Sequence, residues 1–344
     1  MSGPSSTSVP TASASREVFR HLALQMAALD GFMQAQVASF EPEIRDMAAY
    51  CLESTGKRLR PALVFISGWK GEGVVEDPLV RAAGVLEMVH LATLVHDDIM
   101  DAADLRRNRG TAARQFGPDA AVLLGDALFS QALHIAAHFP TTEVCRLVSE
   151  STRKVCSGEI MQTLHRRDMS VTREDYYRVI DLKTAELFRA ACFLGARLAG
   201  FGPEFVQAAN DFGRHLGIAY QIYDDLVDCL GEEKNIGKTL GTDLASGKLT
   251  LPLMLLLEKL STDERAAVIA AMQTGQPLPL AASVEQMRTL GIAADVAQAV
   301  EAELALARGV LEAHRDLAPV PLMLQLIDLL KAQLAALHGS CAKP

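Results

Sequence analysis

The 344-residue sequence has little that would predict β-strands, disulfide bonds or a membrane span. Its six cysteines are scattered and form no CxxC pair, which is typical of reduced thiols in a cytosolic protein. No uninterrupted apolar run reaches the roughly 18 residues that a membrane-spanning helix needs. The first fifteen residues are small and polar and include no apolar signal segment. We therefore expect a cytoplasmic protein with a disordered tail over 1–15 and no transmembrane segment.

An excess of basic residues is also absent. The chain has 33 Lys and Arg against 42 Asp and Glu, which gives a net charge of −9 at pH 7. This charge argues against nucleic acid, or an anionic membrane surface, as a partner of the whole surface. It leaves room for a local basic pocket. Hydrophobic residues make up 49% of the chain, which is ample for a large core.

Helical periodicity is what the chain has instead. Long segments rich in Ala, Leu, Met, Glu and Arg carry apolar residues at spacings of three and four. Thr172 and Thr262, each followed by acidic residues, are typical of helix starts. No stretch resembles an interdomain linker, so we predict an all-α fold with one domain over 16–344. Gly- and Pro-containing stretches predict breaks between helices at 71–73, 116–119, 139–142, 201–204 and 274–279.

Two acidic clusters stand out from the apolar pattern, HLATLVHDDIMD at 90–101 and QIYDDLVD at 221–228. At about 100° per residue, the carboxylates of each cluster share one side of a helix over a single turn. Like charges at this spacing repel, and a cation between them relieves the repulsion. One DDxxD alone would be read as a solvated helix end, but two favour a Mg²⁺ site with oxygen ligands. The candidate metal ligands are Asp97, Asp98, Asp101, Asp224, Asp225 and Asp228.

Basic motifs alternate with the acidic ones along the chain. Any one of them alone would be read as a solubilising surface charge. Together with two metal sites they indicate a phosphorylated substrate, because Arg binds phosphate through a planar fork and Lys as a point charge. The motifs are TGKRLRP at 55–61, DLRRNRG at 104–110, LKTAEL at 182–187 and the glycine-punctuated NIGKTLGTDLASGKLTLP at 235–252.

This motif set resembles the trans-isoprenyl diphosphate synthases, the polyprenyl synthetase family. GKRLRP, HxxxLxHDDxxD, DLRR, KT, QxxDDxxD and GKxxGxDLxxGK occur in the family's order, most clearly over 40–260. The resemblance implies a helical bundle of the isoprenoid synthase type with a deep central cavity, commonly three Mg²⁺ ions, and a homodimer. It implies transfer of an allylic diphosphate's hydrocarbon to isopentenyl diphosphate. Thr55, Arg109 and Gly110 depart from the family's usual GGKRLRP and RRGKPT without loss of charge, and only Lys343 lies near a C-terminus that is basic in many relatives.

The resemblance also implies a role for each matched residue. Among the six aspartates, it points to Asp97, Asp101 and Asp224 as direct metal ligands. The residues matched to groups on the allylic diphosphate are Arg106, Lys183, Lys238 and Lys248. Those matched to groups on isopentenyl diphosphate are Lys57, Arg60, His90 and Arg107. Thr184 and Gln221 match residues near the reacting carbon. We expect the catalytic residues to be Lys183, Thr184 and Gln221.

Product length depends on the helix that precedes Asp97, because the growing chain should run along it. Ala92 and Thr93 lie one turn below Asp97, and Met88 and Val89 lie two turns below. These side chains leave a tunnel open, and the pattern resembles medium- and long-chain members. We therefore predict a medium- or long-chain polyprenyl diphosphate, a product that can be handed to a membrane. The alternatives are a short-chain farnesyl or geranylgeranyl diphosphate synthase whose tunnel Phe129 or Met161 closes, a terpene cyclase, or a partner subunit of a heteromeric synthase.

Overall fold

The fold is given by a computed structural model that describes residues 20–52, 56–106, 109–230, 246–274 and 280–341. The disordered tail expected at 1–15 lies outside the described residues, and the single domain over 16–344 stays a prediction. The described chain is almost entirely helical, which confirms the all-α prediction. Four of the five expected breaks separate helices, and the fifth, at 274–279, lies mostly outside the described residues.

The N-terminal half runs from α2 to α8. Its helices are α2 (Ala23–Ser39), the 3₁₀ turn η1 (Pro42–Ile44), α3 (Arg45–Leu52), α4 (Leu59–Ser67), α5 (Asp77–Met100), α6 (Ala112–Phe116), α7 (Pro118–Ala137) and α8 (Glu143–Leu164). Between α5 and α6, the short strands β1 (Leu105–Arg106) and β2 (Arg109–Gly110) pair antiparallel, with Leu105 opposite Gly110.

The C-terminal half begins at α9 (Arg173–Ile180), which continues through the π-helical turn η2 (Asp181–Ala185) into α10 (Glu186–Leu198). The remaining elements are α11 (Pro203–Leu230), α14 (Leu251–Lys259), α15 (Thr262–Thr274), α16 (Leu280–Thr289), α17 (Ile292–Gly309), the 3₁₀ turn η3 (Glu312–His314) and α18 (Val320–Cys341).

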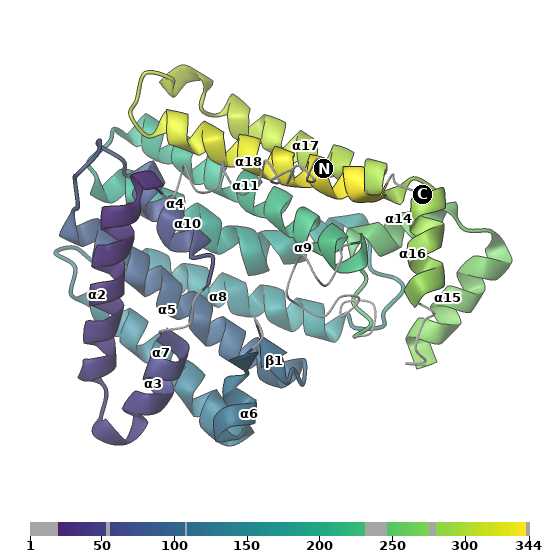
Figure 1. The fold of residues 1–344 in the computed structure, drawn as a ribbon, viewed down its shortest axis with the longest axis horizontal. Coiled ribbons are helices and arrows are strands. Elements are labelled where there is room, and N and C mark those ends of the chain that lie inside the picture. The colour runs from purple at the N-terminus through teal and green to yellow at the C-terminus, as the bar shows by residue number, and fades with distance from the viewer. Residues whose placement is uncertain (1–19, 53–55, 107–108, 231–245, 275–279, 342–344) are drawn as a thin grey trace, which may run out of the picture.

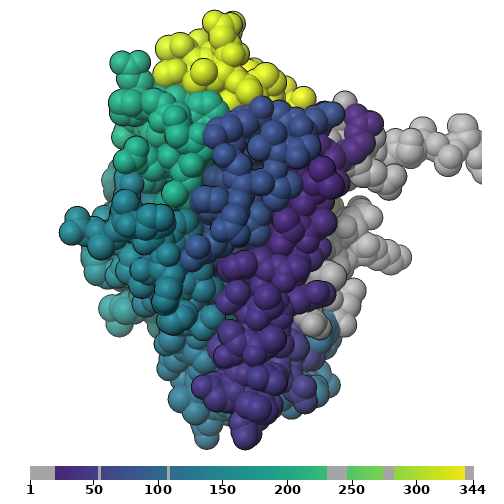
Figure 2. Space-filling view, turned by 90° about the vertical axis from the view of Figure 1, so that its left-hand side faces the viewer, coloured from purple at the N-terminus to yellow at the C-terminus, as the bar shows by residue number. Residues whose placement is uncertain are grey.

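Long helices surround a core to which α5, α10 and α11 contribute most. Helix α10 packs against α4, α5 and α11, while α17 and α18 lie along α11 on one side of the molecule (Figure 1). Helix α2 packs on α5, and the space-filling view shows the purple N-terminal helix lying along this face beside the blue segments (Figure 2). Helix α5 is buried on nearly every side from Leu79 to Ala92, as expected of a central helix that is apolar all round.

Two predicted helix starts can be compared with the structure. Thr172 is the N-cap of α9 and forms a capping box with Asp175, as its sequence context predicts. Thr262 is the first residue of α15 rather than its cap. The cap is Ser261, whose hydroxyl accepts from the Glu264 backbone N–H at 3.4 Å and donates to the Glu264 carboxylate at 2.6 Å. Ser261 is the cap because it lies three residues before Glu264, whose side chain can complete a capping box.

By length and composition alone, three helices could cross a membrane: 77–100, 118–137 and 320–337. The sequence has no uninterrupted apolar run of this length, and we expected no transmembrane segment. An 18-residue stretch can nevertheless be apolar enough to span a membrane when it includes up to two charged residues. The α5 window is 72% buried inside the protein, so the apolar character of that helix serves the core. The windows in α7 and α18 are 39% buried, so these two helices expose more of their surface.

Close helix packing depends on a few glycines, of which Gly217 of α11 is one. A Cβ atom on Gly217 would lie 2.6 Å from the Cα and 2.9 Å from the Cβ of Ala185, in the π-helical turn. Real carbon atoms do not approach this closely, so the backbones can stay in contact only while residue 217 has no side chain. Gly31, in the middle of α2, differs because a Cβ atom there would have nothing within 4 Å, so this glycine contributes no such contact.

We predict opposite effects on stability for the same substitution at these two glycines. Gly217→Ala should lower the melting temperature, because α11 must move away from the π-helical turn. Gly31→Ala should raise it by the equivalent of about 0.5–1 kcal/mol, the usual difference in helix propensity. Thermal unfolding followed by circular dichroism measures both variants against the parent protein. Equal effects at the two positions would contradict the packing described here.

Candidate active site

The first aspartate motif lies where the buried helix α5 ends. Asp97 is partly exposed, with 17% of its side chain accessible. Asp98 is buried and accepts a hydrogen bond on Oδ1 from Arg106 Nε at 2.7 Å, and Arg106 Nη2 lies 2.6 Å from the same oxygen in an ion pair. Asp101 caps the helix, with Arg166 Nη2 at 2.5 Å from Oδ1 and Lys248 Nζ at 3.2 Å from Oδ2. The repulsion within the motif is therefore offset by basic groups from three other segments.

The two outer aspartates of this motif differ in charge compensation. Burial raises the pKa of Asp97 to about 6; Lys183 opposes the rise and Glu159 adds to it. Burial also tends to raise the pKa of Asp101, but the positive charges of Lys248 and Arg166 outweigh this effect and hold that pKa below its usual value. Asp97 is thus the point in the cluster where positive charge is short.

The second aspartate motif lies near the C-terminal end of α11. Asp224 has accessible surface, whereas Asp225 and Asp228 are only 4% and 2% exposed. Asp225 accepts hydrogen bonds from Gln221 Nε2 on one oxygen and from Tyr176 Oη on the other, each at 2.7 Å. The three carboxylates of this motif therefore occupy different environments, and of the three only Asp224 has accessible surface.

The π-helical turn at Asp181–Ala185 connects the two motifs. Lys183 contacts the first one: its Nζ lies 3.9 Å from Asp97 Oδ2, donates to Gln162 Oε1 at 2.9 Å and forms an ion pair with Glu159. The next residue, Thr184, contacts the second, since its hydroxyl donates to Gln221 Oε1 at 2.7 Å. The wider π turn lets adjacent residues reach two different helices.

Two features hold this turn in place. Gly158 of α8 faces it, and a Cβ there would lie 2.7 Å from the Lys183 backbone nitrogen, so α8 can approach only through a glycine. At the start of the turn, Asp181 accepts a bidentate pair from Arg214 of α11, with both N–O distances at 2.9 Å. The position of Lys183 and Thr184 is therefore set by backbone packing on one side and an ion pair on the other.

The basic residues of the other motifs separate into two groups. Lys57 is exposed, and Arg60 lies near the start of α4 with its guanidinium carbon 5.3 Å from the centre of the Phe188 ring. His90 is partly exposed on α5, two turns before Asp97. Arg58 and Arg109 are instead bound to other parts of the protein, Arg58 to Asp30 and Arg109 to the Tyr50 ring at 3.6 Å. Arg107 and Lys238 lie outside the described residues.

Sequence reasoning missed Arg166, together with Glu159, Gln162 and Tyr176. Arg166 follows α8 and is 65 residues from Asp101, so no local motif connects the two. The adjacent Arg167 donates its backbone N–H to the carbonyl of Gly247, a residue with φ of +72°, at 2.9 Å. This contact brings the end of α8 next to Lys248. A basic pair after a long amphipathic helix was the one available signal.

Of the residues predicted to line the product tunnel, only Thr93 has accessible surface. Its hydroxyl donates to the His90 carbonyl at 2.7 Å. Ala92 and Met88 are fully buried and Val89 is 1% exposed. Phe129, considered as a tunnel floor, lies against His96 with ring centres 5.8 Å apart. A tunnel along Met88 and Val89 stays a prediction.

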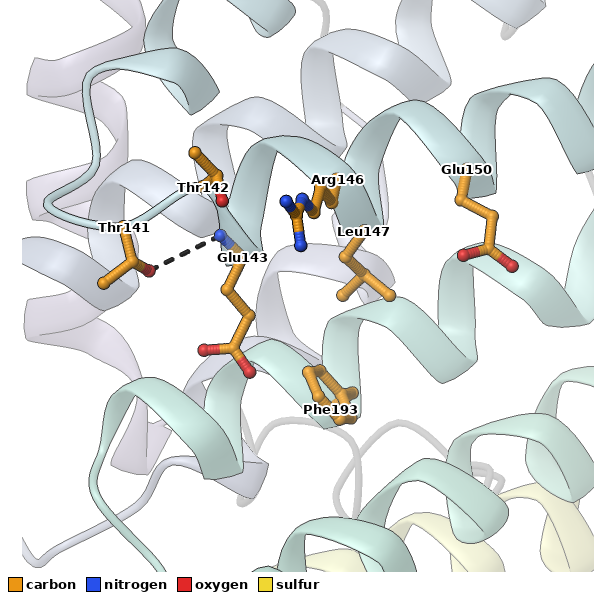
Figure 3. A pocket seen from close by; sticks show the side chains of 7 residues that line it. All are labelled: Thr141, Thr142, Glu143, Arg146, Leu147, Glu150 and Phe193. Carbon is orange, nitrogen blue, oxygen red and sulfur yellow. Dashed lines mark hydrogen bonds between the residues drawn. The ribbon is translucent and has the colours of Figure 1, made fainter.

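The lining of a surface cavity of about 370 Å³ includes no residue of either aspartate motif (Figure 3). It is formed at the start of α8 and by Phe193 of α10, and it includes Glu143, Arg146 and Leu147. None of the predicted site residues lines it. The candidate active site is therefore defined by its side chains and not by this cavity.

Comparisons with known proteins decide the family. The sequence profile of the polyprenyl synthetase family matches residues 41–287, which is most of the chain and includes both aspartate motifs. The octaprenyl diphosphate synthase of Escherichia coli is 34% identical over 253 residues, covering 74% of this chain and 78% of that enzyme. The chain belongs to the polyprenyl synthetase family.

Solved structures agree with this assignment. A decaprenyl diphosphate synthase from Rhodobacter capsulatus has a TM-score of 0.85 at 30% identity, covering 93% of this chain and 99% of that one. A polyprenyl synthase from Caulobacter crescentus, in complex with calcium and isoprenyl diphosphate, has a TM-score of 0.86 at 26% identity, covering 96% and 99%. The isoprenoid synthase fold expected from the motifs is confirmed, and so is the enzyme class, a prenyltransferase.

The oxygen donors of this polyprenyl synthetase fit a hard divalent cation. Among the residues that the structure describes, no three His, Cys, Asp or Glu side chains gather closely enough to hold an ion by themselves. Mg²⁺ does not require such a cage, since it keeps several waters and takes one or two carboxylates together with substrate phosphates. The solvent-accessible carboxylates of Asp97, Asp101 and Asp224 and the shortage of positive charge at Asp97 meet that requirement.

We predict that Asp97→Asn stabilises the metal-free protein near pH 7.5, by about 2 kcal/mol. A folded-state pKa of about 6, above the unfolded value, means that folding places an ionised carboxylate where it is disfavoured. The gain should shrink near pH 5, where the folded-state carboxyl of the parent is protonated. Differential scanning calorimetry in the presence of a chelator measures both conditions.

Asp101→Asn is the matched control for this prediction. The pKa of Asp101 is lowered by Lys248 and Arg166, so its charge stabilises the folded state above the unfolded pKa. Its removal should lower the melting temperature near pH 7.5. A destabilised Asp97→Asn protein at that pH would show that Asp97 has a compensating partner in the metal-free state.

Proposed function

We propose that this prenyltransferase condenses an allylic diphosphate with isopentenyl diphosphate in trans, repeatedly, to a medium- or long-chain polyprenyl diphosphate. The single observation that carries the proposal is the π-helical turn between the aspartate motifs. It places the cation Lys183 beside Asp97 and the hydroxyl of Thr184 on Gln221. Two adjacent residues of the turn thus have different tasks: Lys183 faces the diphosphate, and Thr184 lies at the carbon from which that diphosphate departs.

The diphosphate end of the site is rich in cations that are already gathered. Arg106, Lys183 and Lys248 each contact an aspartate of the first motif and can pass from carboxylate to diphosphate with small movements. Bound Mg²⁺, which we propose as the cofactor with three ions per site, would act as a Lewis acid on the leaving group. The calcium and isoprenyl diphosphate bound by the Caulobacter crescentus neighbour support a divalent-metal site of this kind. Lys238 would add to the cations here.

We assign isopentenyl diphosphate to the basic residues near the start of α4. Lys57 is free in solvent, Arg60 is held against Phe188, and His90 lies on the stripe of α5 that leads to Asp97. The planar guanidinium suits a bidentate contact with phosphate, which fixes the orientation of the second substrate. Holding both substrates in register accounts for a large part of the barrier reduction in a two-substrate reaction. Arg107 completes the proposed set.

The reaction itself depends more on dipoles that stabilise positive charge, and on the exclusion of water, than on a protein base. As the allylic C–O bond breaks, the carbonyl oxygen of Gln221 and the hydroxyl oxygen of Thr184 can face the developing positive charge. The double bond of isopentenyl diphosphate then attacks that carbon, and the departing diphosphate takes the proton that is lost. The buried apolar surround of Thr184 excludes the water that would otherwise capture the cation.

Small side chains near Asp97 support the longer product. Thr93 is the accessible residue one turn below Asp97, and no aromatic side chain occupies positions 92 or 93. The octaprenyl and decaprenyl diphosphate synthases that the chain resembles point the same way. We propose a cytoplasmic enzyme that passes its apolar product to a membrane. Cell fractionation with the protein only in the membrane pellet would contradict that location.

A homodimer is the proposed assembly, because neighbouring helices expose large apolar side chains. Val122 and Leu123 on α7 are 42% and 67% exposed, and Ile160 and Leu164 on α8 are 59% and 75% exposed. Scattered single exposed apolar residues are normal, but a group on two adjacent helices indicates an interaction surface. A second copy of the chain would cover it.

We predict products longer than geranylgeranyl diphosphate when the purified chain is incubated with Mg²⁺, isopentenyl diphosphate and farnesyl diphosphate. Chromatography of the dephosphorylated products resolves their length. Thr93→Phe should shorten the product, because the ring would block the path one turn below Asp97. Thr93→Val is the matched control. It keeps the branched shape of threonine and loses only the hydroxyl that donates to the His90 carbonyl, so the product length should not change.

Other results of that experiment would select an alternative. Products that stop at geranylgeranyl diphosphate in the parent protein would make it a short-chain synthase. Cyclic hydrocarbons without use of isopentenyl diphosphate would make it a cyclase. Absence of any product from the chain alone would overturn independent catalysis and favour a partner subunit.

We predict a dimer by sedimentation velocity, and a monomer for the double variant Leu123→Asp, Leu164→Asp. Charged groups at these positions would have to be buried in the proposed interface, which is costly without partners. Leu24→Asp on α2, where the leucine is 57% exposed, is the matched control and should remain dimeric. A monomeric parent protein would contradict the proposal outright.

A further inference from the structure

Four polar side chains form a continuous chain of hydrogen bonds across three segments of the bundle. Tyr176 of α9 donates to Asp225 Oδ2, Gln221 donates through Nε2 to Asp225 Oδ1, and Thr184 donates to Gln221 Oε1. Each donor–acceptor distance is 2.7 Å, and Tyr176, Asp225 and Thr184 are buried. Hydrogen bonds in such surroundings are strong and costly to leave incomplete, so this chain should hold one geometry.

The carboxylate at the centre of this chain fixes the direction of the amide. An ionised carboxylate only accepts hydrogen bonds, so Asp225 must face the NH₂ end of Gln221. The carbonyl end then faces Thr184. Without the carboxylate, the two ends of the amide have nearly the same size, and sterics alone would not choose between them. Asp225 therefore decides which atom of Gln221 is presented on the side of Thr184.

This direction matters because the proposed reaction develops positive charge on that side. A carbonyl oxygen there stabilises an allylic cation, whereas an amide NH₂ group would oppose it. Asp225 is 4% exposed and both of its oxygens accept from protein donors, while the adjacent Asp224 has open surface. The two neighbouring carboxylates are thus suited to different tasks.

We infer that Tyr176 and Asp225 are positioning residues that orient the amide of Gln221, and that Asp225 is not a metal ligand. The inference rests on the proposed function, because it gives Gln221 a role at the reacting carbon. Tyr176 donates to the Asp225 oxygen that Gln221 does not use, so loss of its hydroxyl removes a hydrogen bond that holds the carboxylate in place. Its effect should appear in the chemical step and not in the binding of either diphosphate.

Tyr176→Phe tests the outer half of this arrangement, since it removes the hydroxyl and keeps the ring. We expect kcat to fall about 10-fold or more, with KM for both diphosphates and the Mg²⁺ concentration for half-maximal activity changed less than about twofold. Tyr177→Phe is the matched control. Its ring packs against Tyr176 with centres 5.5 Å apart, but its hydroxyl takes no part in the chain of hydrogen bonds, and its constants should match the parent.

Asp225→Asn tests the inner half and separates positioning from metal binding. Asparagine keeps the shape but can offer its own NH₂ group to Gln221, which allows the amide to reverse. We expect a larger loss of kcat than for Tyr176→Phe. Calorimetric titration of Mg²⁺ with farnesyl thiolodiphosphate, whose bridging sulfur prevents reaction, should give the parent's affinity for Asp225→Asn and a weaker affinity for Asp224→Asn.

The outcomes distinguish this inference from the proposed function. A parent-like kcat for folded Tyr176→Phe, or a loss of metal-dependent binding in Asp225→Asn equal to that in Asp224→Asn, would overturn the inference and leave the prenyltransferase reaction intact. A parent protein that forms no product would overturn the proposed function first. Circular dichroism and melting temperatures confirm that each variant is folded before its constants are compared.

Discussion

Like charges placed one helical turn apart repel, and the surroundings of the α5 terminus are built to oppose that repulsion. Arg106 binds Asp98, and Arg166 and Lys248 bind Asp101. Lys183 reaches Asp97 only at 3.9 Å because it also binds Glu159 and Gln162. The cluster is therefore compensated unevenly, and Asp97 is the carboxylate that is left with the least compensating positive charge.

Backbone packing determines where those charges can meet. Gly158 and Gly217 allow α8 and α11 to approach the π-helical turn from two sides, and the Asp181–Arg214 ion pair fixes its beginning. An ordinary α-helical turn in place of the π turn would rotate Lys183 or Thr184 away from its helix, since each residue of an α-helix turns by about 100°. The functional geometry thus depends on residues that carry no chemistry of their own.

Much of the fold and the acidic half of the site followed from the sequence, because helical periodicity and the DDxxD spacing are local. Contacts between segments that are distant in the sequence could not be predicted in this way. Arg166 and Tyr176 lie 65 and 49 residues from the aspartates they bind, and nothing near them in the chain marks the pairing. Arg58 and Arg109 show the opposite case. Their motifs suggested phosphate binding, but the structure pairs them with Asp30 and the Tyr50 ring.

The two DDxxD motifs have the same residues, but helix geometry places the two adjacent aspartates of each motif in different environments. Adjacent residues on a helix face directions about 100° apart, so two neighbouring aspartates cannot both face the same opening. In α5 the outward member is Asp97 and the inward member, Asp98, binds Arg106; in α11 Asp224 has accessible surface and Asp225 is buried. A buried carboxylate is costly unless it is fully hydrogen-bonded, and each inward aspartate has acquired donors from neighbouring segments. The motif therefore places an accessible carboxylate on one side of the helix and a hydrogen-bonded polar frame on the other.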